Sequence, residues 1–311
     1  MKILDAAQTA AALPFEQLIP MLREAFATGA EVPLRHRHDM PQPDGTTAAL
    51  LLMPAWRANG FVGVKVVSVY PGNGARNLPA VSASYLLCDG ATGEHLALID
   101  GAEITRRRTA AASALAASFL AREDTTALLI VGSGHIAGLM AAAYRVVRPI
   151  KRVRIWNVRA AGAVRLAARL RAEGWAAEAV TDLAGAVAEA DIVTCATLAR
   201  ESLVCGKWLR AGAHLDLIGG FTPAMREADD EAVRRSRVFI DTDAALAEAG
   251  DLIDPIAHGV LRRDDIAGSL FTLCRGETPG RRNRDEITLF KSVGSALEDL
   301  AAAALAYGQA E

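Results

Sequence analysis

The sequence predicts an α/β protein with two domains, one of them built on a doubly wound parallel sheet, and three observations carry this prediction. The chain has 311 residues, enough for two compact domains with buried cores. Between residues 116 and 292, short and continuously apolar segments alternate with helical ones, as in a parallel sheet covered on both faces. Before residue 116, β-rich runs are separated by Pro-Gly, Asn-Gly and Asp-Gly pairs, which indicate antiparallel hairpins.

The first domain is predicted to comprise residues 1–115 together with 293–311. Hairpin strands are expected within residues 60–100, and the segment 101–121 is expected to form a helix that leads into the second domain. The segment 287–309, "ITLFKSVGSALEDLAAAALAYGQ", has the pattern of one long amphipathic helix returning to the first domain. This return makes the first domain a discontinuous α+β domain.

The second domain is predicted to span residues 116–292. Its expected strands are the apolar segments at 126–132, 152–156, 176–180, 191–197, 214–220 and 237–243. Its expected helices include an alanine-rich stretch after residue 134 and the segments 160–174 and 182–190, the second of these three closed by Gly174.

Composition excludes several classes of function. The formal net charge of −2 offers no field that would recruit nucleic acid or an anionic membrane. No apolar run reaches the length of a membrane span, and the N-terminal sequence does not resemble a signal peptide. The cysteines form no C-x-x-C pair, and His36 and His38 have no third ligand nearby, so we expect a cytoplasmic protein with reduced thiols and no metal.

A glycine-rich turn follows the first strand of the second domain. The sequence Gly132-Ser133-Gly134-His135-Ile136-Ala137 fits the G-x-G-x-x-A pattern, directly after an apolar strand and at the start of a helix. In this context the first glycine permits the tight turn, Gly134 lets the backbone approach a pyrophosphate, and Ala137 lets the helix pack closely. The helix N-terminus offers free N–H groups to the phosphates. The turn therefore predicts a dinucleotide site of the Rossmann type.

The next strand, "RVRIW", ends without the acidic residue that would bind the ribose 2′-hydroxyl of NAD. Asn157 and Arg159 follow it instead. An amide can donate a hydrogen bond to a 2′-phosphate, and a guanidinium can pair with it, whereas an acid would repel it. These two residues favour NADP(H), with NAD(H) the less favoured alternative if Arg159 is only a solvated surface residue.

Over nearly its full length the chain resembles the ornithine cyclodeaminase/mu-crystallin family. The resemblance rests on the order and spacing of seven segments: "VPLRHRH", "VGVKVV", "GAEITRRRTAAASALA", "VGSGHIA", "RIWNVR", "TLARESLV" and "LFKSVGSALED". It implies a substrate-binding and dimerisation role for the first domain, a homodimer assembled through that domain, and an active site between it and the nicotinamide.

The resemblance also assigns roles to individual positions. It implies that Lys65 and Arg108 are catalytic and bind the substrate together with Arg35, and that Thr197, Lys291 and Ser292 lie at the cofactor. The chemistry agrees, because guanidiniums hold carboxylates by paired hydrogen bonds and a buried lysine near other cations can take part in proton transfer. The residues alone leave alternatives open: Arg106 or Arg107 for Arg108, and Arg37 for Arg35.

The chain departs from the family pattern at Phe221. Ornithine cyclodeaminases carry an aspartate just after a Gly-Gly or Gly-Ala pair, whereas here Phe221 follows Gly219-Gly220. A phenylalanine can neither hold an ammonium group nor move a proton. The departure counts against ornithine cyclodeamination and alanine oxidation, and an apolar wall suits a flat cyclic imine.

The predicted reaction is the NADPH-dependent reduction of Δ1-pyrroline-2-carboxylate or Δ1-piperideine-2-carboxylate to L-proline or L-pipecolate. Arg35 and Arg108 would clamp the carboxylate, with Lys65 beside it, and the imine nitrogen would take its proton from bulk or through water held by Lys65. The alternatives are an ornithine cyclodeaminase or alanine dehydrogenase activity, and a non-catalytic NADPH- or small-ligand-binding protein.

Overall fold

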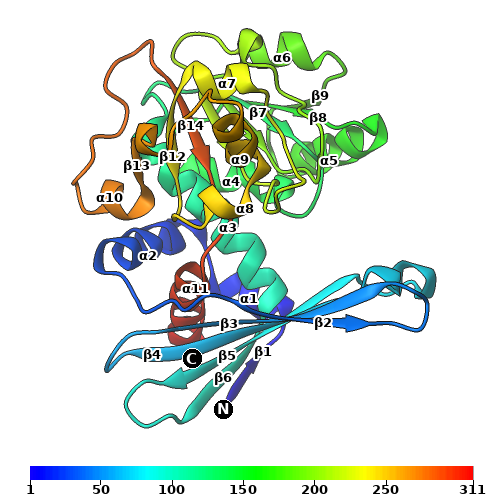
Figure 1. The fold of residues 1–311 in the computed structure, drawn as a ribbon, viewed down its shortest axis with the longest axis vertical. Coiled ribbons are helices and arrows are strands. Elements are labelled where there is room, and N and C mark those ends of the chain that lie inside the picture. The colour runs from blue at the N-terminus through cyan, green and yellow to red at the C-terminus, as the bar shows by residue number, and fades with distance from the viewer. Residues whose placement is uncertain (311) are drawn as a thin grey trace. The chain divides into compact units, whose positions relative to one another are not determined.

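The computed structural model describes residues 1–310 and divides the chain into two units, each with its own sheet (Figure 1). One unit consists of Met1–Arg108 and Ser295–Glu311, and the other of Thr109–Gly294. The first boundary falls inside helix α3, Gly101–Leu120, so the predicted boundary at residue 115 lies further along the same helix. The C-terminal helix belongs to the first unit, which is therefore discontinuous in sequence.

The first unit contains a six-stranded sheet in the order β1-β6-β5-β4-β3-β2. The β1–β6 pair is parallel and the other pairs are antiparallel, as the hairpin punctuation predicts. The strands are β1 Lys2–Leu4, β2 His36–Pro41, β3 Thr47–Trp56, β4 Phe61–Val69, β5 Val81–Asp89 and β6 His95–Asp100.

Helices cover one face of this sheet. They are α1 Ala6–Ala12, α2 Phe15–Thr28 and α11 Ala296–Gln309, with a 3-10 turn, η1, at Pro71–Arg76. The helix α11 packs against β3, β4, β5 and β6 and against α2. Because side chains alternate along a strand, every second residue of the central strands points to α11 and is buried there.

The second unit contains an eight-stranded sheet in which all pairs are parallel, in the order β13-β12-β14-β11-β10-β7-β8-β9. The strands are β7 Ala127–Val131, β8 Arg152–Trp156, β9 Ala177–Ala179, β10 Ile192–Cys195, β11 His214–Leu217, β12 Ser236–Ile240, β13 Gly268–Ser269 and β14 Ile287–Lys291. The helices are α4 Ala137–Val147, α5 Ala160–Ala172, α6 Leu183–Glu189, α7 Asp230–Arg234, α8 Ala245–Glu248, α9 Gly250–Ala257 and α10 Leu270–Cys274, with 3-10 turns at Gly206–Trp208 and Arg263–Asp265. The prediction of a doubly wound Rossmann-type sheet is confirmed.

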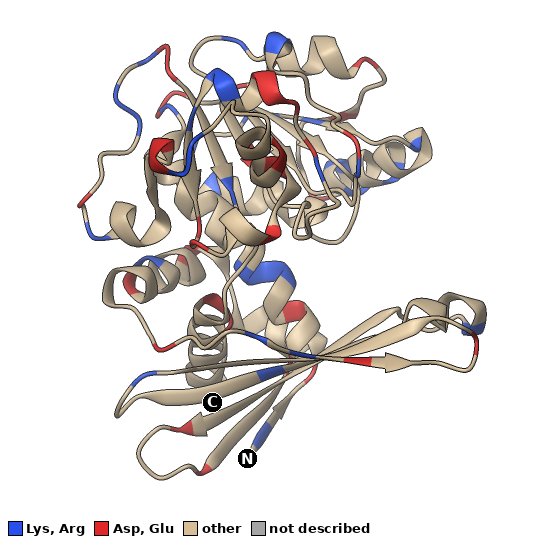
Figure 2. Ribbon diagram, viewed as in Figure 1, with Lys and Arg blue, Asp and Glu red and all other residues tan. Residues whose placement is uncertain are grey.

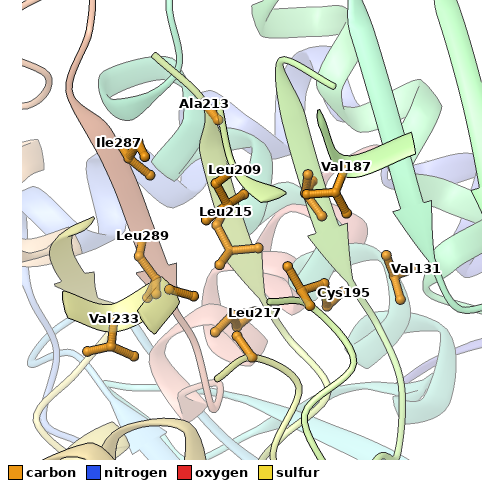
Figure 3. Close-up of a cluster of buried hydrophobic side chains, with 14 of the residues drawn as sticks. Val131, Val187, Cys195, Leu209, Ala213, Leu215, Leu217, Val233, Ile287 and Leu289 are labelled. Carbon is orange, nitrogen blue, oxygen red and sulfur yellow. The ribbon is translucent and has the colours of Figure 1, made fainter. Parts of the chain in front are cut away.

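Figure 3 shows the core on one face of this sheet. On this face, leucines of β11 and β14 form one cluster with Val131 of β7, Val187 of α6 and Val233 of α7. All of these side chains are buried. Continuous apolar strands explain this arrangement, because helices cover both faces of a parallel sheet.

The prediction of a helix over 287–309 is wrong in its first part. Ile287–Lys291 is strand β14, which lies between β11 and β12 near the middle of the sheet and is completely buried. The helix α11 begins only at Ala296, where the side chain of Ser295 caps it. A short apolar run fits the pattern of either a helix or a strand. Here the run pairs in parallel with β11 on one side and β12 on the other, so it forms a strand.

Figure 2 shows basic and acidic residues interspersed along the ribbon of each unit. Among the helices of residues 1–310, none has both the length and the apolar character needed to cross a membrane.

Candidate functional site

Four charged side chains form a buried cluster in the first unit. The ammonium of Lys65 on β4 lies 2.6 Å from Asp299 Oδ2 and donates to Thr105 Oγ1 at 3.2 Å. Arg108 on α3 donates through Nε to Asp299 Oδ1 at 3.0 Å and through Nη1 to Glu298 Oε2 at 2.8 Å. All four charged side chains are less than a tenth exposed. Asp299 therefore connects the two cations, one through each carboxylate oxygen.

The local structure explains why these groups meet. Lys65 occupies a position of β4 that faces the helices, like its buried neighbour Val67. Glu298 and Asp299 lie in the first turn of α11, the helix that covers this face and whose positive end favours acids. Sequence-distant segments thus place two acids opposite two bases.

The structure distinguishes Arg108 from its two neighbours. Arg106 and Arg107 both form ion pairs with Glu103, which lies one turn earlier on the same helix. Arg107 also donates to the Leu13 carbonyl at 3.0 Å. Arg108 alone among the three reaches the acids of α11. Of the three arginines that the sequence left open, Arg108 is the one that joins Lys65 in a shared cluster.

Burial and the neighbouring charges have opposing effects on the pKa values of Lys65 and Asp299. Burial lowers the pKa of Lys65, and Arg108 lowers it further, while the charge of Asp299 raises it. Burial would raise the pKa of Asp299, but Lys65 and Arg108 outweigh it, so this pKa is lowered. Asp299 therefore stays ionised, and its charge is the main influence that keeps the proton on Lys65.

Both cations retain donors after these contacts. Lys65 has three N–H groups, of which Asp299 and Thr105 occupy two. Arg108 uses Nε and Nη1, and its Nη2 makes no hydrogen bond within residues 1–310. These remaining N–H groups can bind an anion, since a guanidinium and an ammonium are the usual partners of a carboxylate.

Arg35 and Arg37 lie at the start of the edge strand β2. Arg37 is exposed and pairs with Asp39 on the same strand at 2.9 Å. Arg35 is half-buried and immediately precedes the strand.

In the second unit, the glycine turn has the geometry that the sequence predicts. Gly132 has a φ of 118°, and a Cβ there would lie 2.6 Å from the carbonyl oxygen of Ala196. Gly134 and His135 are exposed at the turn, and no atom lies within 4 Å of where a Cβ on Gly134 would stand. Helix α4 begins just after Ile136, at the buried Ala137. The turn thus leaves open backbone at a helix N-terminus.

Asn157 and Arg159 follow β8 beside this turn. The Asn157 side-chain amide donates to the Arg159 carbonyl at 2.9 Å, and Arg159 precedes α5 as its N-cap with its side chain exposed. A Cβ on Gly162 would lie 2.9 Å from Asn157 Nδ2 and closer still to Ser133 Oγ. Gly162, which sequence reasoning missed, therefore keeps Ser133 and Asn157 adjacent.

Thr197 follows β10 and is held by an acid that the sequence analysis did not select. Glu227 accepts hydrogen bonds from Thr197 N at 2.8 Å, Thr197 Oγ1 at 2.7 Å and Gly219 N at 2.7 Å. Burial raises the pKa of Glu227 to about 7. One carboxylate thus ties together the loops after β10 and β11, at the carboxyl edge where doubly wound sheets bind ligands.

The side chain of Lys291 is not exposed at the loops predicted to hold the cofactor. It is completely buried at the end of β14, where Nζ donates to the Leu217 carbonyl at 3.0 Å and pairs with Asp251 Oδ2 at 3.3 Å. Ser292 is buried next to it, and its N–H donates to Leu217. In this geometry the ammonium of Lys291 supports the loop after β11.

Phe221 lies at the end of that loop and is 45% exposed. The adjoining Gly220 and Gly219 are buried against Asp251 and Thr197. The loop therefore presents an aromatic ring where an acid stands in the cyclodeaminase pattern. Among residues 1–310, no group of three or more histidine, cysteine, aspartate or glutamate side chains has the arrangement of a metal site.

Comparisons with known proteins extend these observations. The model of the ornithine cyclodeaminase/mu-crystallin family matches residues 2–311. A Δ1-pyrroline-2-carboxylate reductase of Colwellia psychrerythraea is 37% identical over 97% of this chain and 97% of its own length. The ketimine reductase mu-crystallin of Rattus norvegicus is 33% identical over 93% of this chain and 91% of its own length.

The chain is also similar to solved structures. The Δ1-pyrroline-2-carboxylate reductase of Thermococcus litoralis, in complex with NADH and L-proline, has a TM-score of 0.91 and 36% identity, covering 100% of this chain and 97% of that one. An archaeal alanine dehydrogenase dimer with bound NAD has a TM-score of 0.90 and 27% identity, covering 100% and 96%. Because the family model matches residues 2–311 and these relatives align with nearly the whole chain, the protein belongs to the ornithine cyclodeaminase/mu-crystallin family.

Proposed function

We propose that this protein reduces cyclic ketimines that carry one carboxylate, with Δ1-pyrroline-2-carboxylate as the principal substrate and Δ1-piperideine-2-carboxylate as a second. It is an NAD(P)H-dependent oxidoreductase that acts on imines. The single observation that carries the choice of substrate is Phe221, which stands in place of the aspartate of the cyclodeaminases. The relatives from Colwellia and Thermococcus, named for this reductase activity, support the proposal.

The second unit fits a nicotinamide dinucleotide. Gly132 adopts a positive φ, and the backbone at Gly134 is open at the N-terminal end of α4. Exposed N–H groups at such a helix end bind phosphates without a cationic side chain. When bound, the reduced dinucleotide supplies a hydride from C4 of its nicotinamide to the carbon of the C=N bond.

The protein's own residues bind, orient and supply the proton. The substrate carboxylate pairs with the free Nη2 of Arg108 and with Arg35. The remaining N–H of Lys65 directs a proton, directly or through one water, to the imine nitrogen. The two-electron reduction then balances: the carbon gains the hydride, the nitrogen gains the proton, and a cyclic amino acid and the oxidised dinucleotide leave.

We also propose that NADPH is preferred over NADH. The exposed Arg159 and the amide of Asn157 follow β8, where an acid would select NAD. A 2′-phosphate near them can pair with the guanidinium and can accept from the amide once the amide leaves the Arg159 carbonyl. Because the solved relatives hold NADH or NAD, the ratio of turnover with NADPH to turnover with NADH tests this preference.

The first unit is proposed to form a homodimer through the sheet face opposite its helices. A row of paired residues crosses five strands there: Ile3, Leu98, Leu86, Val64 and Pro54. Ile3 is 68% exposed and Leu98 37% exposed, and no helix of this unit covers the row. An exposed apolar sheet face of this kind marks an interface, and the archaeal alanine dehydrogenase is a dimer.

A cytoplasmic location completes the proposal. None of the four cysteines forms a disulfide, and Cys195 is buried. Reduced thiols are the rule in the cytoplasm.

The wild-type protein is expected to oxidise NADPH rapidly with Δ1-pyrroline-2-carboxylate, measured by the loss of NADPH absorbance. Lys65→Ala is expected to lower kcat/KM by about 100- to 10,000-fold, the usual range for a proton-transfer group. Arg108→Ala is expected to lower kcat/KM as well, because it removes a charged partner of the substrate carboxylate. Arg106→Ala is the matched control, since Arg106 pairs with Glu103 on the same helix. Absence of turnover with either imine, despite NADPH binding, would favour the binding-protein alternative, and turnover of ornithine or alanine would favour the other activities.

Arg159→Ala is expected to weaken NADPH use selectively. Loss of a charge-assisted hydrogen bond costs about 1.5–3 kcal/mol, so the ratio of kcat/KM for NADPH to that for NADH should fall roughly 10- to 150-fold. Arg165→Ala, on the following helix, serves as the control for a lost positive charge. Equal ratios in the wild type and in Arg159→Ala would contradict the preference.

Val64→Asp is expected to convert the dimer into a monomer, because it buries a charge in the apolar row. Sedimentation velocity measures the mass, and circular dichroism checks that the fold is kept. A Glu94→Lys variant, at an exposed turn, controls for altered surface charge. A monomeric wild type at micromolar concentration would refute the interface.

A further inference from the structure

The proposed mechanism uses Lys65 and Arg108 but leaves the acids of α11 without a role. We propose that Asp299 is a positioning residue of the reaction, which fixes the Lys65 ammonium and the Arg108 guanidinium in one arrangement and holds the proton on Lys65 until the imine takes it. This inference rests on the proposed function and goes beyond it, because it assigns to Asp299 a chemical role that substrate contact does not require.

The geometry supports a positioning role. Asp299 has no exposed surface, and its two carboxylate oxygens serve different cations, Oδ2 for Lys65 and Oδ1 for Arg108. A lysine side chain has four rotatable carbons and no fixed direction, so a short contact of 2.6 Å from a rigid helix limits where Nζ can lie. The donors that remain on Lys65 and Arg108 are then held on a common scaffold.

The charges around Lys65 come from each element packed against it. Helix α11 contributes Asp299 and Glu298, and α3 contributes Arg108. On β5 the register partner of Lys65 is the neutral Tyr85, whose hydroxyl is buried without a hydrogen-bond partner among residues 1–310. Burial and Arg108 favour the neutral amine, and the two acids favour the ammonium, with Asp299 the stronger. Removing the charge of Asp299 therefore shifts the balance toward the neutral amine.

The cluster is also neutral as a whole, with two cations and two anions. A protonated cyclic imine with one carboxylate is neutral as well. Without Asp299 the cluster would carry one excess positive charge, which would oppose protonation of the imine nitrogen close by. Asp299 is therefore suited to a zwitterionic substrate, while it holds the group that donates the proton.

The test compares Asp299→Asn with Glu298→Gln. Both variants replace a buried acid of α11 by an amide of the same size, but only Asp299 contacts Lys65. The pH dependence of kcat/KM with Δ1-pyrroline-2-carboxylate is expected to show a basic limb that moves to lower pH in Asp299→Asn by about 1–3 units, the range for loss of an opposite charge in contact. The shift in Glu298→Gln should be clearly smaller. Equal basic limbs in all three proteins would overturn the inference, as a merely structural role predicts.

A second measurement needs no turnover. The chain has lysines only at positions 2, 65, 151, 207 and 291, so the Nζ signal of Lys65 in the ¹⁵N-lysine-labelled protein is assigned by its loss in Lys65→Arg. Its titration should give an ammonium at neutral pH in the wild type and a lower midpoint in Asp299→Asn. A neutral Lys65 in the wild type at neutral pH would overturn the inference even if Asp299→Asn does not fold.

The two measurements separate the inference from the proposed function. A wild type that turns over neither imine would refute the proposed function, whereas the Lys65 titration would still decide whether Asp299 holds its proton. Normal turnover with an unchanged Lys65 midpoint in Asp299→Asn would refute the inference alone.

Discussion

The contact between Lys65 and Asp299 is the interaction on which the account of this protein depends. Two ions buried together are stable only if each is paired and hydrogen-bonded, and removing one partner typically costs about 3–5 kcal/mol because the other charge is left uncompensated. Asp299 satisfies this condition for Lys65 and Arg108 at once. The need to cover β4 with α11 and the need to place two donors for a carboxylate are therefore met by the same few side chains.

In the second unit, backbone conformation rather than ion pairing shapes the glycine turn. Its glycine turn depends on the positive φ of Gly132 and on the open helix end, and the loops around it are tied by Glu227. Lys291 and Asp251 lie beneath these loops as a buried pair. These supporting groups are more buried than Arg159 and Phe221, the residues proposed to contact ligands, which remain exposed.

Sequence reasoning predicted the parallel sheet and the glycine turn, because local patterns encode them: an apolar run, a glycine and a helix follow one another. It placed Lys65 and Arg108 only through the family resemblance, since a lysine in a strand and an arginine in a helix have no local signature. It missed Asp299, which lies 191 positions from Arg108, and Glu227, whose partners are 30 and 8 positions away in separate loops. It also extended α11 over β14, because a five-residue run with three apolar residues fits either element until the neighbouring strands are known.

A double-mutant cycle measures how strongly Lys65 and Asp299 depend on each other for the stability of the fold. The free energy of unfolding is measured by urea denaturation, followed by circular dichroism, for Lys65→Met, Asp299→Leu and the double variant. We predict that each single variant is destabilised by about 3–5 kcal/mol and that the double variant loses much less than the sum. Single effects that add to within about 0.5 kcal/mol would show that the two charges do not depend on each other, and would contradict the account.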